Sequence, residues 1–189
     1  MGIGEKISSG TWGDTQWNLY TSKELPEAAL VTAAGCVAIR DLATKEVVLT
    51  YTPNRNIGNG VRVGQWEILG GHLDPIDPED PENDARETPE MAVRREALEE
   101  GGFYVGRMGL FAHREIINPP DSEYPQLGYY PFYWAISGER LVKPTDPEQP
   151  ATGIFTLGQL DNLVHQNLMN PVERHIVRLG IGAALEDLQ

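Results

Sequence analysis

Residues Glu87–Phe103 read ETPEMAVRREALEEGGF and carry the densest pattern in this chain of 189 residues. Thr88 is a typical helix N-cap, Pro89 suits the first position of a helix, and the pair Gly101–Gly102 is a strong helix terminator. The segment therefore predicts a helix over Pro89–Glu100.

Three glutamates of this helix share one face. Glu96, Glu99 and Glu100 stand at positions i, i+3 and i+4, so their carboxylates lie within about 100° of arc. Arg95 can pair with Glu99 but does not neutralise all three, and like charges at this spacing cost roughly 0.2–0.5 kcal/mol per pair. A solvated helix face has the same composition, so the spacing alone leaves that interpretation open. The other interpretation is a divalent cation site, because clustered carboxylates suit Mg²⁺ or Mn²⁺.

The surroundings of the glutamates resemble the signature of the Nudix hydrolases, G-x5-E-x7-R-E-U-x-E-E-x-G-U, where U is apolar. Every specified position from Glu87 to Phe103 matches, and Trp66–Gly71 (WEILGG) is similar to the strand and glycine pair that open the signature. The resemblance extends from about Ala29 to the C-terminus. It implies an α+β fold, a Nudix-like α/β/α sandwich with a mixed β-sheet, in which residues 29–189 form the Nudix domain and residues 1–28 an N-terminal arm.

The sequence departs from the signature at two places. The family usually has five residues between the glycine and the glutamate, whereas 15 residues separate Gly71 from Glu87. The extra residues fall in an acidic segment, residues 72–86, with a proline at every third position, which predicts an exposed loop. Arg86 also stands where a glycine commonly precedes the glutamate. A surface insertion costs little closure entropy, so we expect it to alter substrate access or choice rather than the fold.

The resemblance also implies roles for single residues. The metal ligands are Glu96, Glu99 and Glu100, with the carbonyl of Gly71 as a further ligand, and the ion is Mg²⁺, or Mn²⁺ in its place. Glu96 is also a candidate base, Arg95 positions the neighbouring carboxylate, and Glu87 is an auxiliary carboxylate. A downstream acid often serves as general base in the family, which points to Glu148, with Asp146 and Glu115 as rivals. No residue is assigned to substrate binding.

The rest of the chain predicts further strands and helices. Two apolar, β-branched segments flank a short turn and indicate an antiparallel pair, Ala29–Arg40 with Glu46–Thr52. Residues 1–28 read as a loosely structured arm or an edge strand, and Asn54–Gly64, rich in Gly and Asn, reads as a loop. Strands are expected at Trp66–Leu69, Met108–Ile117, Tyr129–Ser137 and Ile154–Leu157, and helices at Gln159–His165 and after Asn170–Pro171. This order favours a mixed-sheet sandwich over strict βαβ alternation.

Composition excludes several classes of protein. Lys and Arg total 15 against 28 Asp and Glu, a formal net charge of −13, so nucleic acid is not an expected partner. The single cysteine, Cys36, excludes an internal disulfide framework and is expected to be buried. The sequence shows no leader and no apolar run that approaches 18 residues, which predicts a soluble, cytoplasmic protein without a membrane partner. A homodimer stays open.

The function that the resemblance implies is metal-dependent hydrolysis of a diphosphate linkage in a nucleoside diphosphate joined to another group. ADP-ribose, nucleotide sugars, dinucleoside polyphosphates and nucleoside triphosphates are the candidate substrates. A proline 16 residues past the signature is associated with ADP-ribose hydrolysis in the family, and Pro119 stands there. One alternative is a catalytically silent module that senses a nucleotide. Another is isomerisation of an isoprenoid diphosphate, which needs a catalytic cysteine, and Cys36 is poorly placed for that role.

Overall fold

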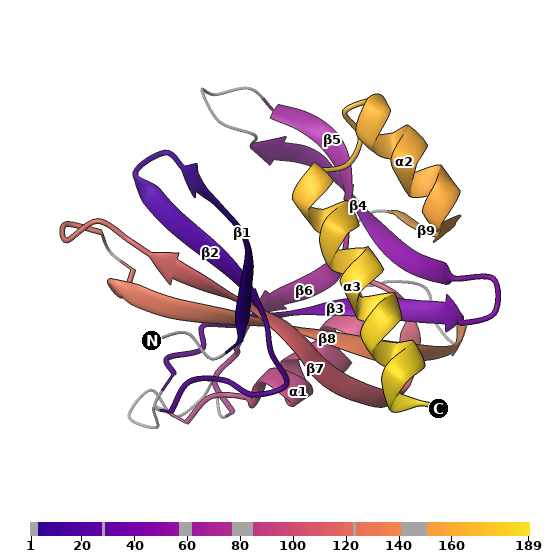
Figure 1. Cartoon of the computed structure of the whole chain (residues 1–189), viewed down its shortest axis with the longest axis horizontal. Coiled ribbons are helices and arrows are strands. Elements are labelled where there is room, and N and C mark those ends of the chain that lie inside the picture. Colours follow the sequence, from indigo (N-terminus) through magenta and orange to yellow (C-terminus); the bar gives the residue numbers. More distant parts are fainter. Residues whose placement is uncertain (1–3, 28, 57–61, 77–84, 123, 141–150) are drawn as a thin grey trace.

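The computed structural model of the chain (Figure 1) describes residues 4–27, 29–56, 62–76, 85–122, 124–140 and 151–189. Its elements are, in chain order, β1 (Glu5–Trp12), β2 (Thr15–Thr21), β3 (Ala33–Asp41), β4 (Glu46–Asn56), β5 (Arg62–Glu67), β6 (Leu69–His72), α1 (Pro89–Glu99), β7 (Phe103–Ile117), β8 (Leu127–Arg140), β9 (Ala151–Thr156), α2 (Leu157–His165) and α3 (Pro171–Asp187). No helix among the described residues is long and apolar enough to span a bilayer.

The described strands form one mixed sheet. Their order is β1-β2-β7-β8-β3-β4-β5, with β6 paired to β3 and β9 paired to β4. The central strand β3 runs parallel to β8 and antiparallel to β4 and β6. The predicted pairing of Ala29–Arg40 with Glu46–Thr52 is the β3–β4 ladder, and the expected mixed sheet is confirmed.

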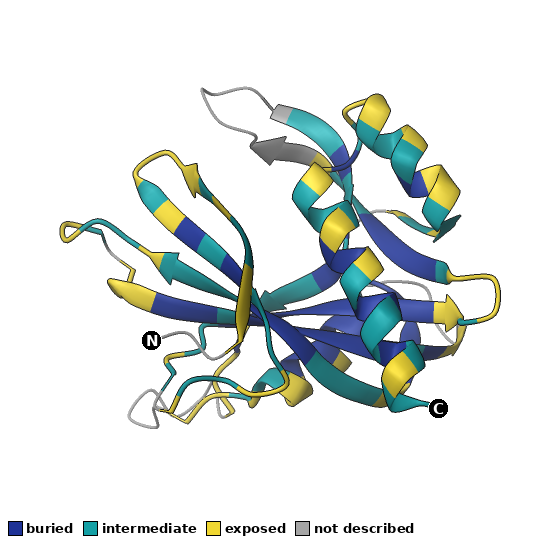
Figure 2. Cartoon of the chain, viewed as in Figure 1, coloured by how far each residue is buried: buried dark blue, intermediate teal, exposed yellow. Residues whose placement is uncertain are grey.

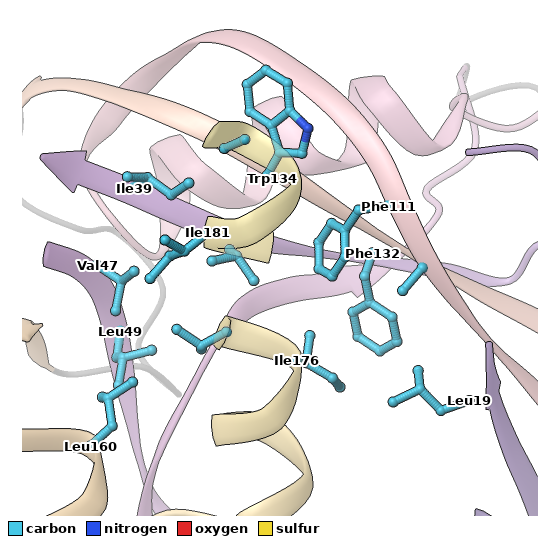
Figure 3. Packing of buried hydrophobic residues seen from close by; sticks show 14 of the residues in the cluster. Leu19, Ile39, Val47, Leu49, Phe111, Phe132, Trp134, Leu160, Ile176 and Ile181 are labelled. Atoms are coloured by element: carbon cyan, nitrogen blue, oxygen red, sulfur yellow. The ribbon is translucent and has the colours of Figure 1, made fainter. Parts of the chain in front are cut away.

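Helices α1 and α3 lie on opposite faces of the sheet (Figure 1), and the side chains of β3 alternate between these two faces. Ala34, Cys36 and Ala38 belong to a core cluster that α1 completes from one face of the sheet. Val37 and Ile39 belong to the other cluster, which α3 completes with Ile176, Val177 and Ile181 (Figure 3). Both helices turn their buried faces toward the sheet (Figure 2), so the arrangement is the expected α/β/α sandwich.

The helix ends form where the local sequence predicts them. The Thr88 hydroxyl accepts a hydrogen bond from the Met91 N–H at 3.3 Å, and the Asn170 side chain accepts one from the Val172 N–H at 2.9 Å. Pro89 and Pro171 occupy the first turn of their helices. Glu100 is the C-cap of α1 rather than its last residue, a difference of one position from the prediction.

The prediction of a loop over Asn54–Gly64 was wrong for the described part of that segment. Strand β4 continues to Asn56 and β5 begins at Arg62, in a register that pairs Arg55 with Val63 after an irregularity that follows Thr52. The ladder with a neighbouring strand overrides the weak strand propensity of Gly and Asn, because that propensity depends strongly on tertiary context.

Residues 5–21 form a β-hairpin that extends the sheet. Strand β2 pairs with β7 in a regular antiparallel ladder, and β1 lies at one edge of the described strands. The sequence left two interpretations for residues 1–28, a loosely structured arm or an edge strand. Glu5–Trp12 form an edge strand, and β2 is a further strand that lies inside the sheet. Successive side chains of β2 point to opposite faces of the sheet, and Trp17 and Leu19 lie on the buried face.

A histidine is buried in the part of the sheet that the hairpin extends. His113 on β7 is fully buried, its ring is 5.3 Å from that of Tyr20 and 5.7 Å from that of Tyr129, and neither ring nitrogen has a hydrogen-bond partner within the described part of the chain. Burial lowers the pKa of His113, and the charge of Glu115 opposes this shift only in part. The folded protein therefore favours neutral His113.

Acid is expected to destabilise the protein through His113. Above about pH 6.5, the ordinary histidine pKa, His113 is neutral in both the folded and the unfolded chain, so it does not affect the free energy of unfolding. Below that pH the unfolded chain binds a proton more readily than the folded protein, so stability falls until the lowered pKa is passed. H113F keeps a ring in the stack and should reduce the loss of unfolding free energy between pH 7.5 and 5.5, measured by urea denaturation. The exposed-site variant H165Q should lose as much as the wild type. If H113F and the wild type lost the same unfolding free energy between these pH values, groups other than His113 would cause the acid sensitivity.

Candidate active site

Two of the signature glutamates and the glycine pair meet at one cleft. Glu96 and Glu100 on α1 are 8% and 3% exposed, and Gly70 and Gly71 lie on β6, which packs against that helix. These four residues line a cleft of about 700 Å³. The structure thus brings the WEILGG segment and the helix together at one cleft.

Arg95 connects the helix to the two segments that precede it. Its Nε donates to both carboxylate oxygens of Glu87 at 3.0 and 3.2 Å, and its Nη2 donates to Glu87 Oε2 at 3.0 Å and to the His72 carbonyl at 2.8 Å. The carboxylate of Asp74 lies 3.4 Å from Nε. The planar fork of arginine makes this set of contacts, which the single ammonium of lysine cannot reproduce.

The same guanidinium binds two of the predicted metal ligands. Arg95 Nη1 donates to Glu96 Oε1 at 2.8 Å and to Glu99 Oε2 at 3.0 Å. The Glu99 side chain is 44% exposed and is absent from the described lining of the cleft, whereas Glu96 belongs to that lining. Arg95 therefore offsets the repulsion between these carboxylates and contacts Glu96, the neighbouring carboxylate that the sequence predicts it to position.

Burial and ion pairing act in opposite directions on these groups. For Glu87, burial raises the pKa, but hydrogen bonds from Arg95 and the Asp74 N–H outweigh it and leave the pKa below the ordinary value. For Glu96, burial raises the pKa and exceeds the opposing effect of Arg95. Glu87 is thus held as a carboxylate, and Glu96 accepts a proton more readily than an exposed glutamate.

The two glycines allow β6 to approach the glutamates. Glu100 Oε2 accepts a hydrogen bond from the Gly70 N–H at 3.0 Å. A Cβ at Gly71 would lie 2.1 Å from Glu96 Oε1, and one at Gly70, where φ is +154°, would lie 2.4 Å from the Ala34 carbonyl oxygen. A side chain at Gly71 would fill the space beside the Glu96 carboxylate, and one at Gly70 would collide with the backbone of β3, so both positions need glycine for steric reasons.

The donor set has the chemistry of a hard cation site. Glu96 and Glu100 present buried carboxylate oxygens to the cleft beside the Gly71 backbone, and such oxygens are the ligands that Mg²⁺ prefers. In the part of the chain that the structure describes, no group of three or more His, Cys, Asp or Glu residues is already arranged to hold a metal ion. Glu96 and Glu99 instead pair with Arg95, and Glu100 pairs with Gly70.

The three candidates for the general base have different outcomes. Glu148 and Asp146 lie in residues 141–150, outside the described residues, so both stay predictions. Glu115 accepts a hydrogen bond from Asn18 Nδ2 at 2.8 Å and is absent from the described lining of the cleft. Its neighbours in the ladder, Arg114 and Ile116, do line the cleft, so Glu115 points to the other face of the sheet.

Two further carboxylates on the cleft are absent from the sequence prediction. Glu67, 8% exposed, accepts a hydrogen bond from the Thr52 hydroxyl at 3.2 Å, and Glu173 accepts one from the Ile68 N–H at 3.1 Å. Glu67 lies inside the quoted WEILGG segment, but Glu173 comes from the first turn of α3, far along the chain. Only the tertiary fold brings these two groups to the glutamates of α1.

Comparison with known proteins agrees with this geometry. The family model described as the NUDIX domain matches residues 29–179, and the chain belongs to this family. A mutant of the pyrophosphohydrolase BsRppH from Bacillus subtilis is similar in fold, with 14% identity, a TM-score of 0.54, and coverage of 80% of this chain and 77% of that one. A NUDIX hydrolase from Nitrosomonas europaea has 14% identity, a TM-score of 0.56, and coverage of 79% and 86%. No curated protein sequence matches the chain.

The family assignment confirms the predicted resemblance and fold class. At 14% identity the two solved structures establish the shared fold, and the signature residues establish that this chain retains the glutamate set of a Nudix hydrolase. Cys36 is fully buried, and burial raises the pKa of its thiol to about 12. A buried, protonated thiol does not serve as a catalytic acid or nucleophile on the cleft, which argues against the isomerase alternative.

Replacing Arg95 should show how much the ion-pair network contributes to stability. R95K keeps the charge but loses the fork, and hydrogen bonds to charged groups contribute enough that we expect a loss of about 2 kcal/mol in unfolding free energy. Urea denaturation without added metal measures it. The control R178K changes an arginine that pairs with Asp161 at the surface and should cost less than about 0.5 kcal/mol. Equal losses in the two variants would contradict a central role for Arg95.

Proposed function

We propose that the protein is a Nudix-type pyrophosphohydrolase that uses Mg²⁺, or Mn²⁺ in its place, to cleave a diphosphate linkage in a nucleoside diphosphate joined to another group. The observation that carries this proposal is the convergence of Glu96, Glu100 and the Gly70–Gly71 pair on one cleft, with Arg95 beside them. Membership of the NUDIX family and the names of the two similar structures support the same reaction class.

The carboxylates and the Gly71 carbonyl would hold the cation. In this proposal Glu96, Glu99 and Glu100 are the side-chain ligands, and a bound divalent ion neutralises diphosphate charge and lowers the pKa of an attacking water. A cation is required at this place because Glu67, Asp74 and Glu173 make the described lining strongly acidic, and a polyanionic substrate would otherwise be repelled.

Arg95 and Glu87 would keep the helix in place while the ligands turn to the cation. The bonds from Arg95 to Glu87 and to the His72 carbonyl do not involve a predicted ligand, so they persist when Glu96 and Glu99 leave the guanidinium. Glu96, a buried carboxylate on the cleft, is also a candidate base in this proposal. Glu148 remains the proposed general base of the downstream segment.

Removing one carboxylate charge should abolish hydrolysis. We expect E100Q to lower kcat/KM by at least about 100-fold, since an amide is a poor ligand for a hard cation. Phosphate and nucleotide release would be measured with ADP-ribose, nucleotide sugars and nucleoside triphosphates in Mg²⁺ or Mn²⁺. E186Q makes the same chemical change on an exposed residue of α3 and should retain wild-type activity.

The panel also separates the hydrolase from a nucleotide sensor. Cleavage of one substrate class by the wild type and by E186Q, and its loss in E100Q, supports the proposal and names the substrate. Nucleotide binding without release of product from any member of the panel would favour the sensor. E148Q and D146N, assayed beside E100Q, would show whether either downstream acid affects the pH profile of kcat.

Metal binding can be measured without turnover. A ligand that binds only the folded state stabilises it by about 2.7 kcal/mol at 100 times its Kd, so Mg²⁺ should raise the Tm of the wild type. E96Q removes a buried ligand and should lose most of this increase, while E186Q should keep it. A metal-dependent increase of equal size in E96Q would place the cation elsewhere.

A further inference from the structure

We infer that the β1–β2 hairpin supplies the wall of the cleft that stacks on the base of a nucleoside-containing substrate, with Trp12 as the stacking ring. The hairpin precedes the family match, which begins at residue 29. The inference rests on the proposed function, because it takes the cleft that Glu96 and Glu100 line as the substrate site. It adds to that proposal the part of the chain that would recognise the base.

The sheet register puts the residues of this wall on one face of the sheet. Trp12 pairs with Thr15 across the hairpin, and Leu19 pairs with Arg114, which in turn pairs with Tyr130 on β8. Directly opposed residues of an antiparallel ladder point to one face, here the face that α3 covers. The cleft joins this face to Glu96 and Glu100, since its lining also includes Trp12, Thr15, Arg114, Ile116, Tyr130 and Phe132.

Trp12 is fixed in position by its neighbours. The Arg114 guanidinium lies 4.7 Å from the centroid of the Trp12 ring and 5.3 Å from that of Trp17. The two indoles are 5.8 Å apart, and the Thr15 hydroxyl at the hairpin turn donates to Asn118 Oδ1 at 3.0 Å. A ring already held by a cation and a second ring loses little freedom when a ligand stacks on it.

Trp12 is held by these contacts and is nevertheless partly open to solvent. The residue is 47% exposed, whereas Trp17 on the same face of the hairpin is only 6% exposed. Scattered apolar residues at a surface are ordinary. Trp12 differs because its open ring borders the cleft that holds the glutamates, and Tyr124, 60% exposed, borders the cleft as well.

Charge divides the cleft into two ends that suit different parts of a substrate. The glutamate end requires a cation to accept diphosphate, whereas Arg114 at the hairpin end is the single Lys or Arg among the described lining residues. Tyr130 joins the two ends, since a Cβ at Gly70 would lie 2.7 Å from the Tyr130 hydroxyl. A nucleoside diphosphate fits this division: charged phosphates at one end, and an uncharged base that stacks on an aromatic ring at the other.

The test measures binding and needs no turnover, so it stands apart from the hydrolase assay. Calorimetric titration in Mg²⁺ would compare AMP with ribose 5-phosphate, which has the same phosphate and sugar without the base. Base–aromatic stacking predicts that the wild type binds AMP about tenfold tighter, and that W12A loses this advantage. W12F keeps a ring and should stay within about threefold of the wild type, which separates stacking from loss of the fold.

A matched control replaces another open aromatic residue of the sheet. Tyr104 on β7 is 61% exposed and is absent from the described lining of the cleft, so Y104A should bind AMP as the wild type does. Equal affinities of the wild type for AMP and ribose 5-phosphate would overturn the inference, and so would undiminished AMP binding by W12A. If hydrolysis fails on every substrate while W12A still weakens AMP binding, the proposed reaction is wrong and the subsite remains.

Discussion

The guanidinium of Arg95 is the contact on which the arrangement of the cleft depends. It lies among Glu87, Glu96 and Glu99, whose carboxylates would repel one another without it. It also holds the end of β6 through the His72 carbonyl, so one side chain fixes the helix against the strand that carries Gly70 and Gly71. The short distance between Gly71 and Glu96 follows from that constraint. The cost of gathering acidic groups at one place is offset by a cation that belongs to the chain itself.

The ten-residue insertion is accommodated by a short stem of backbone hydrogen bonds. The Glu87 N–H donates to the Asp74 carbonyl, the Ile76 N–H donates to the Ala85 carbonyl, and Arg86 Nη1 donates to the Leu73 carbonyl. The stem returns the chain beside its starting point, so Glu87 reaches Arg95 despite the added residues. Arg86, the departure from the usual glycine, takes part in closing it. This explains how the signature tolerates a change in spacing, because closure is local and its entropy grows slowly with loop length.

The sequence predicted the features that short-range chemistry determines. The helix caps at Thr88 and Asn170 depend on residues two or three positions away, and each was found where expected. The features it missed depend on pairing between distant segments. The β4–β5 ladder replaced a predicted loop, and Glu67, Glu173 and Trp12 reach the cleft from three different elements. No local pattern marks such residues, since their common position exists only after the sheet has formed.

Cys36 lies at the centre of β3, between the parallel partner β8 and the antiparallel partner β6, and no part of it is exposed. A thiol in that position reaches solvent only when the central strand separates from its neighbours. The chain has no other cysteine. The rate at which a thiol reagent labels the protein therefore reports opening of the middle of the sheet, undisturbed by motion at the hairpin or the insertion. The molecule carries its own probe of global unfolding.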